Sequence, residues 1–321
     1  MEKANRCAAC AGPATPDADR ERQIEHKSEA GRYALNVHPV FPGIQLIYFD
    51  AHIQSASPEK RGELSGDILE ITHCREGRLE CSVDGAFWYL AAGDLAIVQA
   101  NRLSSSFYFP LRHYHGVTVR IDLSRAPGCL SCLLEDVTVH PRALYERYCA
   151  GGGAFVARSD PSVAHIFSEL YAVPAEIRKG YFKVKVLELL LFLSAPRAMQ
   201  EDAGSHRLPP AQVRLAKEVS RYLAAHMDDR ITLGQLAARF GVSGTQIKNA
   251  FRGVYGVSVG AYARARKMES AAYMLEYTDR SILEIAGEHG YDNSSKFAGA
   301  FRAVKGMAPS EYRRLNRPRE K

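Results

Sequence analysis

Hydrophobic and polar residues alternate with a period of two over much of the first half of the chain. Between about residues 33 and 125, the alternation is clearest in four short runs, at 44–49, 68–74, 79–83 and 117–121. Such alternation is typical of half-buried β-strands. Turn residues at Glu76-Gly77, Asp84-Gly85 and Gly93-Asp94 separate the runs, and the first pair is predicted to lie in a solvated hairpin turn. Short antiparallel strands at this spacing predict a β-sandwich or a small barrel.

The period becomes helical after Asp160-Pro161. Helices are predicted over residues 162–177 and 181–193, and the second is apolar on nearly every side, so it is expected to be buried. Its stripe of Val184, Leu187, Leu190 and Leu191 is either internal core or a dimer seam. We favour a role shared between the two.

The last hundred residues contain one helix-turn-helix pattern written twice. Residues 232–237 align with 281–286, and Gly241 then falls on Gly290. After one inserted residue, the aromatic and glycine positions continue to match, as Phe251 with Phe301, Gly256 with Gly306 and Tyr262 with Tyr312. Two copies are too few for a solenoid, which needs at least about three repeats. The repeat therefore predicts a doubled reader of the DNA major groove.

The first copy carries the signals for two capped helices and the turn between them. Thr232 with Gln235 and Ser243 with Gln246 are capping-box pairs, and Gly241 permits the turn. On the second helix, the residues predicted to face outward and contact DNA bases are Thr245, Gln246, Lys248 and Asn249. Asparagine can pair with adenine and lysine can reach guanine. Ser243 and Arg252 are predicted to contact phosphates.

The second copy repeats the scaffold but not this polar stripe. Ser281 and Glu284 cap its first helix, Gly290 forms the turn, and a helix is predicted from about Asn293 to Lys305. Lys248 and Asn249 correspond here to the short Ala298 and Gly299. We therefore expect this helix mainly to anchor the DNA backbone, through Asn293, Ser294, Ser295, Lys296 and Arg302. A helix over 258–277, roughly 30 Å long, nearly matches the ~34 Å of one DNA turn, so the two readers are expected to enter successive major grooves.

Charge and cysteine content narrow the choice of partners and compartment. Residues 211–321 hold 19 lysines and arginines against 11 acidic residues, a net charge of +8, whereas residues 1–210 carry −2. Only the C-terminal part is thus expected to meet a polyanion. The pairs Cys7/Cys10 and Cys129/Cys132 are either a four-thiolate zinc site or, as we favour, ordinary reduced thiols. Without an apolar membrane span or an export signal, the protein is expected to be cytoplasmic.

The run ILEIAGEHGYDNSSKFAGAFRAVKGMAPSEYRR (282–314) resembles the signature of the AraC/XylS family of bacterial transcription regulators. The resemblance covers about residues 211–316 and includes Gly290, Phe297, Phe301, Pro309 and Tyr312. It implies a two-part DNA-binding unit that contacts RNA polymerase at promoters, and it assigns base reading to Thr245, Lys248 and Asn249. Family members often add a cupin-like barrel that binds an effector and helices that dimerise, which matches the order of elements here.

The expected fold is therefore α+β, with a cupin-like antiparallel β-barrel, dimerisation helices and an all-α domain in which a long helix joins two helix-turn-helix motifs. The expected segments are a disordered tail (1–32), an effector-sensing domain (33–159), a dimerisation segment (160–200), a linker (201–210), the DNA-binding domain (211–316) and a short tail (317–321).

Strand alternation suggests which side chains line such a barrel. His73 shares a face with Leu69 and Ile71, and His113 and His115 share one with Val117. With Trp88 and Tyr48, these three histidines are the candidate effector pocket. A metal site on the histidines and ordinary core or rim positions are the alternatives.

The chain is thus expected to be a homodimeric, effector-responsive transcription regulator that binds promoter DNA, needs no cofactor and does not bind membranes. No phosphate loop, catalytic triad pattern or pair of catalytic carboxylates stands out, so enzymatic activity is not expected. The alternative is a metal-dependent cupin sensor or enzyme fused to a DNA-binding domain.

Overall fold

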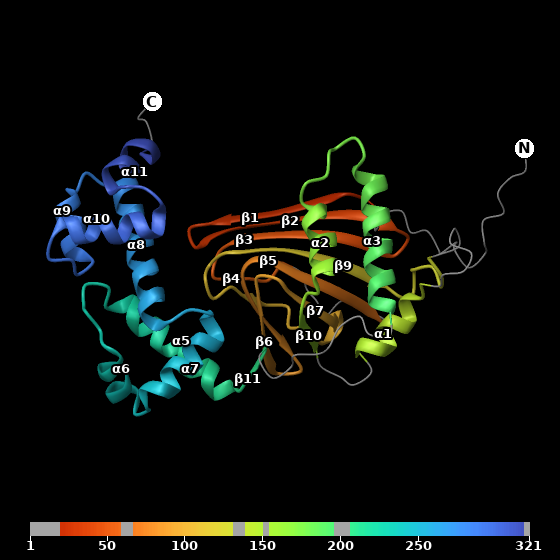
Figure 1. Ribbon diagram of the computed structural model, residues 1–321, viewed down its shortest axis with the longest axis horizontal. Helices are drawn as coiled ribbons and strands as arrows, with labels where there is room; N and C mark the ends of the chain where they lie inside the picture. The colour runs from red at the N-terminus through yellow and green to blue at the C-terminus, as the bar shows by residue number, and fades with distance from the viewer. Residues whose placement is uncertain (1–19, 59–66, 131–138, 150–153, 196–205, 318–321) are drawn as a thin grey trace, which may run out of the picture. The chain divides into compact units, whose positions relative to one another are not determined.

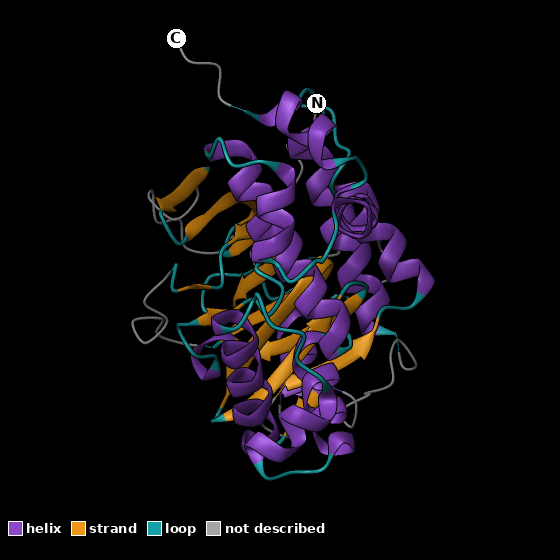
Figure 2. Cartoon of the chain, turned by 90° about the vertical axis from the view of Figure 1, so that its left-hand side faces the viewer, coloured by secondary structure: helices purple, strands orange, loops and turns teal. Residues whose placement is uncertain are grey.

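The computed structural model describes residues 20–58, 67–130, 139–149, 154–195 and 206–317, and the chain divides after Leu208 into two compact units (Figure 1). We call them the N-terminal unit (1–208) and the C-terminal unit (209–321). The strands all belong to the N-terminal unit, whereas the described part of the C-terminal unit is helical (Figure 2). The predicted α+β class is therefore confirmed. None of the described helices is long and apolar enough to span a membrane.

The N-terminal unit is built on one curved antiparallel sheet. Its main path runs through β1 (Arg22–Ser28), β2 (Gly31–Phe41), β3 (Ile44–His52), β9 (Tyr114–Asp122), β5 (Ile68–Val83), β6 (Ala86–Ala91) and β11 (Arg207–Leu208). Further strands extend it, with β7 (Asp94–Gln99) joining β5 to β10 (Ala154–Arg158), and β8 (Phe107–Tyr108) joining β5 to β4 (Ser55–Ala56). The predicted turns at Asp84-Gly85 and Gly93-Asp94 connect β5 to β6 and β6 to β7.

The turn predicted at Glu76-Gly77 is wrong. The runs at 68–74 and 79–83 form the single strand β5, which bulges between Cys74 and Glu76 where it pairs with β9. Gly77 takes the left-handed conformation at φ 81°, and a Cβ there would lie 2.0 Å from the carbonyl oxygen of His113. A polar pair ending in glycine serves a bulge as well as a turn, so local sequence does not separate the two.

Two other boundaries also differ from the prediction. The tail predicted over 1–32 is ordered from Arg22, where β1 pairs with β2. β1 escaped notice because nearly all of its side chains are polar and exposed, which is the pattern of an edge strand. The helix predicted over 162–177 ends at Leu170, since Pro174 cannot continue it. Residues 1–19, the rest of the predicted tail, lie outside the described residues.

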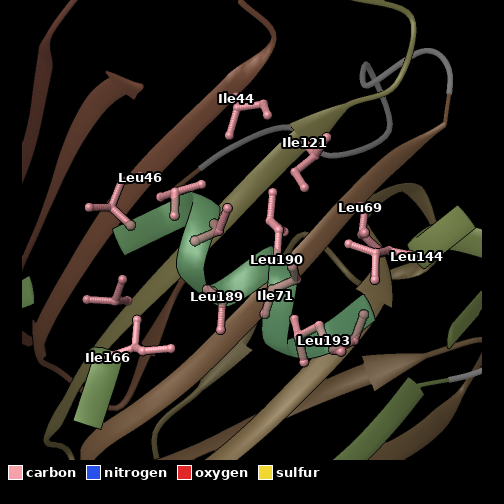
Figure 3. Packing of buried hydrophobic residues seen from close by; sticks show 14 of the residues in the cluster. Ile44, Leu46, Leu69, Ile71, Ile121, Leu144, Ile166, Leu189, Leu190 and Leu193 are labelled. Atoms are coloured by element: carbon pink, nitrogen blue, oxygen red, sulfur yellow. The ribbon is translucent and has the colours of Figure 1, made fainter. Parts of the chain in front are cut away.

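Three helices cover the outer face of the sheet. They are α1 (Pro141–Cys149), α2 (Pro161–Leu170) and α3 (Arg178–Ser194). Between them and the sheet lies the largest apolar cluster, in which Leu189, Leu190 and Leu193 of α3 meet strand residues such as Ile71 and Ile121 (Figure 3). All five of these side chains are fully buried. Each such side chain stabilises the fold by about 1.5–3 kcal/mol relative to exposure, so this layer is the main source of stability in the unit.

Helix α3 also presents apolar side chains to solvent. Val184 is 62% exposed and Leu191 is 38% exposed, whereas Leu190 is completely buried. The predicted stripe therefore splits between a core face and an open face. Ile177, directly before the helix, is 53% exposed and extends the open face at a spacing of seven residues. We call Ile177, Val184 and Leu191 the α3 stripe.

The segment predicted as a free linker over 201–210 is partly a strand. Arg207 and Leu208 pair with Trp88 and Phe87 of β6. His206 is buried beside them, with its Nδ1 3.0 Å from the carbonyl oxygen of Tyr89. The linker prediction is therefore wrong from His206 to Leu208, because two backbone pairs fix a stretch whose composition alone indicates flexibility.

The C-terminal unit contains α5 (Pro210–Ala225), α6 (Leu233–Phe240), α7 (Gly244–Tyr255), α8 (Val259–Tyr277), α9 (Ile282–Glu288), α10 (Ser294–Lys305) and α11 (Pro309–Asn316). The repeat seen in the sequence is also a repeat of packing. The Phe251 and Tyr262 rings meet edge to face at 5.2 Å and 76°, and Phe301 and Tyr312 do the same at 5.3 Å and 76°. The two helix-turn-helix motifs are therefore α6–α7 and α9–α10, with α8 between them.

The two motifs are held together at one joint, which consists of the loop 228–230, the Gly290 turn and Lys267 of α8. The Lys267 amine donates to the carbonyl oxygens of Asp229 and His289, at 3.0 Å each. Arg230 also donates to the carboxylate of Asp292 at 2.7 Å. Partial burial of Lys267 in the joint lowers the pKa of its amine. The spacing of the motifs thus depends on contacts made from both copies.

The two glycine turns give a matched test of this joint. Gly241 and Gly290 occupy equivalent positions at φ 64° and 73°, yet a Cβ on Gly241 would meet nothing within 4 Å, whereas one on Gly290 would lie 2.4 Å from the carbonyl oxygen of Asp228. Gly241→Ala is expected to cost about 1–2 kcal/mol of unfolding free energy, the cost of a left-handed alanine. Gly290→Ala is expected to cost about 1–3 kcal/mol more, because the joint must open. Urea unfolding followed by far-ultraviolet circular dichroism measures both, and equal losses would contradict this role of the joint.

Candidate nucleic-acid interface and interior cavity

Helix α7 presents the polar stripe that the sequence predicts. Thr245, Lys248, Asn249 and Arg252 are all exposed, whereas Ile247, Ala250 and Phe251 on the opposite face are buried. The apolar face packs against α5, α6 and α8. The predicted orientation of this helix is therefore confirmed, and its long polar side chains are available to a partner.

The start of α7 is fixed by its capping box. The Ser243 amide donates to Gln246 Oε1 at 2.9 Å, and the Gln246 amide donates to Ser243 Oγ at 3.2 Å. Gln246 was predicted to contact a base. Because its side-chain carbonyl already accepts a hydrogen bond in the capping box, only its side-chain NH₂ group remains to donate to a base. Thr232 and Gln235 form the same box at the start of α6.

Helix α10 presents basic and small polar side chains in place of the long polar stripe of α7. Ser294, Ser295, Lys296 and Arg302 are exposed, and so is Gly299. Asn293 caps the helix, accepting from the Lys296 amide at 2.8 Å. Free amides at a helix N-terminus attract anions, and Lys296 adds a positive charge there. The first turn of α10 is therefore suited to a phosphate group.

The inner face of the N-terminal sheet encloses a small cavity with an ion pair in its wall. Arg120 of β9 donates through Nε to Glu70 Oε1 of β5 at 2.8 Å, and its Nη2 lies 2.7 Å from the same oxygen. Next to them the hydroxyls of Thr72 and Thr118 lie 2.9 Å apart. The cavity of about 40 Å³ is otherwise lined mainly by apolar groups, including Phe49, Phe107 and Tyr114. Since each water needs roughly 10–15 Å³ of cavity volume, the cavity has room for about three or four waters.

The predicted pocket residues do not line this cavity together. His73 and Tyr48 lie on the outer face of the sheet, under the helices, whereas Trp88 belongs to the inner apolar cluster. The Tyr48 hydroxyl donates to the carbonyl oxygen of Leu170 in α2 at 2.6 Å. The expectation that these side chains share a barrel interior is wrong. Strand alternation shows which residues share a face but not which face is enclosed, and here the more apolar face lies under the helices.

His73 is a buried, neutral core residue. Its ring stacks on Phe167 at 4.5 Å and 7°, and neither ring nitrogen has a hydrogen-bond partner among the described residues. Burial, and to a lesser extent the charge of Arg158, lowers the pKa of His73 to about 4. Because the unfolded histidine binds a proton near pH 6.5 and the folded one does not, this residue lowers stability as the pH falls from about 6.5 to 4.

His113 and His115 lie elsewhere on the outer face, next to His52 of β3. The His113 and His115 rings are 4.7 Å apart, and the His52 ring lies 5.3 Å from the first and 5.2 Å from the second. Burial lowers the pKa of His52, while the nearby carboxylate of Asp50 opposes the shift. We call His52, His113 and His115 the histidine cluster.

Sequence reasoning missed Glu70, Arg120 and His52. Glu70 and Arg120 carried a usable signal, because a charged residue inside an otherwise apolar strand must find a partner when buried. His52 follows Tyr48 and Asp50 at every second position, which places it on their face. Of the two cysteine pairs, Cys7, Cys10 and Cys132 lie outside the described residues, so the four-thiolate site has no described geometry.

A family model described as a helix-turn-helix domain matches residues 236–315. The right origin-binding protein of Escherichia coli K12 is 33% identical over 103 residues, and the match covers 32% of this chain and 36% of that protein. The E. coli K12 HTH-type transcriptional regulator YdiP is 36% identical over 260 residues, which cover 76% of this chain and 78% of YdiP. The arabinose operon regulatory protein of Salmonella typhimurium is 22% identical over 289 residues, covering 88% of this chain and 94% of that protein.

Among solved structures, the DNA-binding domain of AdpA in complex with a target DNA is 28% identical to this chain, with a TM-score of 0.31. The match covers 33% of this chain and 97% of that domain. ToxT from Vibrio cholerae is 12% identical and matches 85% of this chain and 98% of its own, with a TM-score of 0.29.

Proposed function

The chain belongs to the AraC family of DNA-binding transcription regulators, and we propose that it reads two successive major-groove segments of a promoter under the control of a small effector. The observation that carries the proposal is the exposed polar stripe of α7, which two capping boxes and a glycine turn hold in a fixed orientation. This stripe is backed by a C-terminal segment with a net charge of +8.

In this proposal the two DNA-facing helices have different roles: α7 contacts bases and α10 contacts phosphates. Lys248 and Asn249 on α7 are long enough to reach base edges, whereas Ala298 and Gly299 occupy the equivalent places on α10. Helix α10 therefore anchors phosphates through its N-terminal amides, Lys296 and Arg302. Helix α8 has 19 residues and is about 28 Å long, which approaches the ~34 Å of one DNA turn. The joint around Lys267 supports this spacing.

The inner cavity is the proposed effector site. Glu70 and Arg120 offer a charged donor and acceptor in a mainly apolar enclosure, the combination typical of small-molecule sites. At about 40 Å³ the cavity is smaller than a sugar or an aromatic acid, so binding must move side chains of the inner cluster. That movement gives an effector a means of favouring one state of the N-terminal unit over another.

The α3 stripe is the proposed dimer interface. Large apolar side chains at positions 177, 184 and 191 recur every seven residues, the repeat of two helices packed along a common seam. The occupant that fits an identical stripe on a two-fold axis is a second copy of the chain. RNA polymerase stays a predicted partner from the family resemblance alone.

The DNA proposal predicts that substitutions on the two helices weaken DNA binding in different ways. Asn249→Ala is expected to cost about 1–3 kcal/mol at the cognate site and to relax one base position, because a bidentate base contact is lost. Arg302→Ala is expected to weaken binding to all sequences about equally and to lower the slope of log K against log salt by about 1. Footprinting and salt titrations measure both effects on the DNA directly upstream of the gene that encodes this protein. The proposal fails if no site is protected above non-specific DNA.

The effector proposal is tested through Trp88, the single tryptophan of the chain, which lies in the inner apolar cluster. A panel of sugars and aromatic acids is titrated while Trp88 emission is recorded. For a compound that binds, the double change Glu70→Leu with Arg120→Met is expected to weaken binding at least about tenfold, since one lost charged hydrogen bond is worth about 1.5–3 kcal/mol. The double change avoids leaving one buried charge without its partner.

Glu80→Gln is the matched control for this experiment, because Glu80 is also buried but lies outside the cavity lining. It is expected to leave the affinity of the same compound unchanged. An effector whose affinity survives the double change would show that binding takes place elsewhere.

The dimer proposal predicts that one lysine on the α3 stripe separates the two copies. Val184→Lys or Leu191→Lys places a charge in an apolar seam at an exposed position, so the fold is kept while association is weakened. Light scattering is expected to show dimers for the unmodified chain and for Lys183→Ala, which is exposed but off the stripe. A monomeric unmodified chain, or lysine variants that remain dimeric, would exclude this seam.

A further inference from the structure

Three imidazoles lie together on the outer face of the sheet, at the end of β3 and the start of β9, and one carboxylate lies beside two of them. One ring nitrogen from each of His52, His113 and His115 lies within 4.8 Å of the other two. Asp50 Oδ1 lies 3.1 Å from His52 Nε2 and 3.4 Å from His115 Nδ1. This group is separate from both the inner cavity and the helix-turn-helix motifs.

The backbone brings these side chains together in a defined way. Asp50 and His115 are direct partners in the β3–β9 pairing, so their side chains share one face of the sheet. His113 precedes β9 directly after Arg112, which takes the left-handed conformation at φ 57° and donates from Nη2 to the carbonyl oxygen of Ala30 at 2.8 Å. The positions of the histidines thus follow from strand register and from a fixed turn.

The carboxylate supplies a second observation that points to a cation. Asp50 Oδ1 is itself shielded from solvent and accepts no hydrogen bond of good geometry from the described residues, although the side chain as a whole is 49% exposed and two imidazole nitrogens lie within 3.4 Å. A cation bound between this oxygen and the adjacent nitrogens would balance its negative charge. Glu76 adds a further negative charge, 3.6 Å from His113 Nε2.

We propose that His52, His113 and His115, with Asp50 as the fourth donor, bind one divalent first-row transition-metal ion of the Zn²⁺ type. Three nitrogens and one carboxylate oxygen form a donor set that zinc accepts in tetrahedral geometry. Zinc–nitrogen bonds of about 2.0–2.1 Å place the donors roughly 3.3 Å apart, so the rings need only a small rotation inward. The side chains of His52, His113 and His115 are 40%, 37% and 26% exposed, so none of the three rings is locked in a fully buried site.

The first experiment uses the full chain without a purification tag, after treatment with a chelator. Co²⁺ is added first, because its visible absorption reports both coordination geometry and donor type. The expected result is one Co²⁺ per chain with the intense bands of a tetrahedral nitrogen and oxygen site, displaced by one equivalent of Zn²⁺. Bound Zn²⁺ is also expected to raise the melting temperature, since it binds only the folded state.

Substitutions then locate the ion. Loss of a second-shell partner alone costs about 10–100-fold in metal affinity, so His113→Ala and His52→Gln are each expected to cost at least about 100-fold, and Asp50→Asn at least about tenfold. His165→Ala is the matched control, because His165 is an exposed histidine 3.4 Å from a carboxylate of Glu169 but has no second histidine beside it. It is expected to leave affinity and stoichiometry unchanged.

The chain's cysteines provide the competing outcome. Thiolate ligation would give Co²⁺ charge-transfer bands and would be lost in the double change Cys7→Ser with Cys10→Ser. Either of these thiolate results would overturn the proposal. So would an absence of stoichiometric binding by the unmodified chain, or metal binding that survives the double change His52→Gln with His113→Ala. Circular dichroism checks that each variant is folded, and the cobalt spectrum of the unmodified chain tests the donor set without any substitution.

Discussion

In the C-terminal unit, the Lys267 amine donates to the carbonyl oxygen of Asp229, in the loop that leads into the first helix-turn-helix motif, and to that of His289, in the turn of the second. Each motif is a small helical bundle with its own aromatic pair, so neither needs the other for its local fold. What they need from each other is a defined separation, and α8 supplies it only if both motifs are held against it. The close approach of Gly290 to Asp228, which leaves no room for a side chain, completes this joint. In the proposed DNA complex, the separation of the two DNA-facing helices therefore depends on a few contacts between the loop before α6, α8 and the turn before α10.

In the N-terminal unit, both faces of the sheet carry apolar side chains that must be buried. The helices cover one face, chiefly with aliphatic side chains from α3. The apolar side chains on the inner face pack against one another in a second cluster. A buried ion pair there is a weak source of stability, since taking two charges out of water offsets most of their attraction. In the proposed effector site its value would lie in selectivity, because Glu70 and Arg120 are the charged groups in an otherwise mainly apolar lining.

The helical half of the molecule could be predicted well because its signals are local. Ser243 and Gln246, or Ser281 and Glu284, form their caps within one turn of helix, so the spacing in the sequence is also the spacing in space. The sheet depends on pairings between distant segments. Whether Gly77 serves a turn or a bulge was decided by the carbonyl of His113, 36 positions later in the chain. Alternation assigned His73 to a pocket, and Tyr48 and Trp88 were added to it as nearby aromatic residues, yet the packing of the helices determines which face of the sheet is covered.

The pairing of β11 with β6 has a consequence for how the chain is made. The free edge of β6 is covered by residues 207–208, more than a hundred positions further along the chain. During synthesis this edge therefore stays open at least until residues 207–208 have been made. Open strand edges pair with other chains. A fragment that ends before Arg207 would therefore keep the apolar core of the sheet but expose an unpaired edge of β6 that can pair with other chains. A fragment of the N-terminal unit should end at or after Leu208.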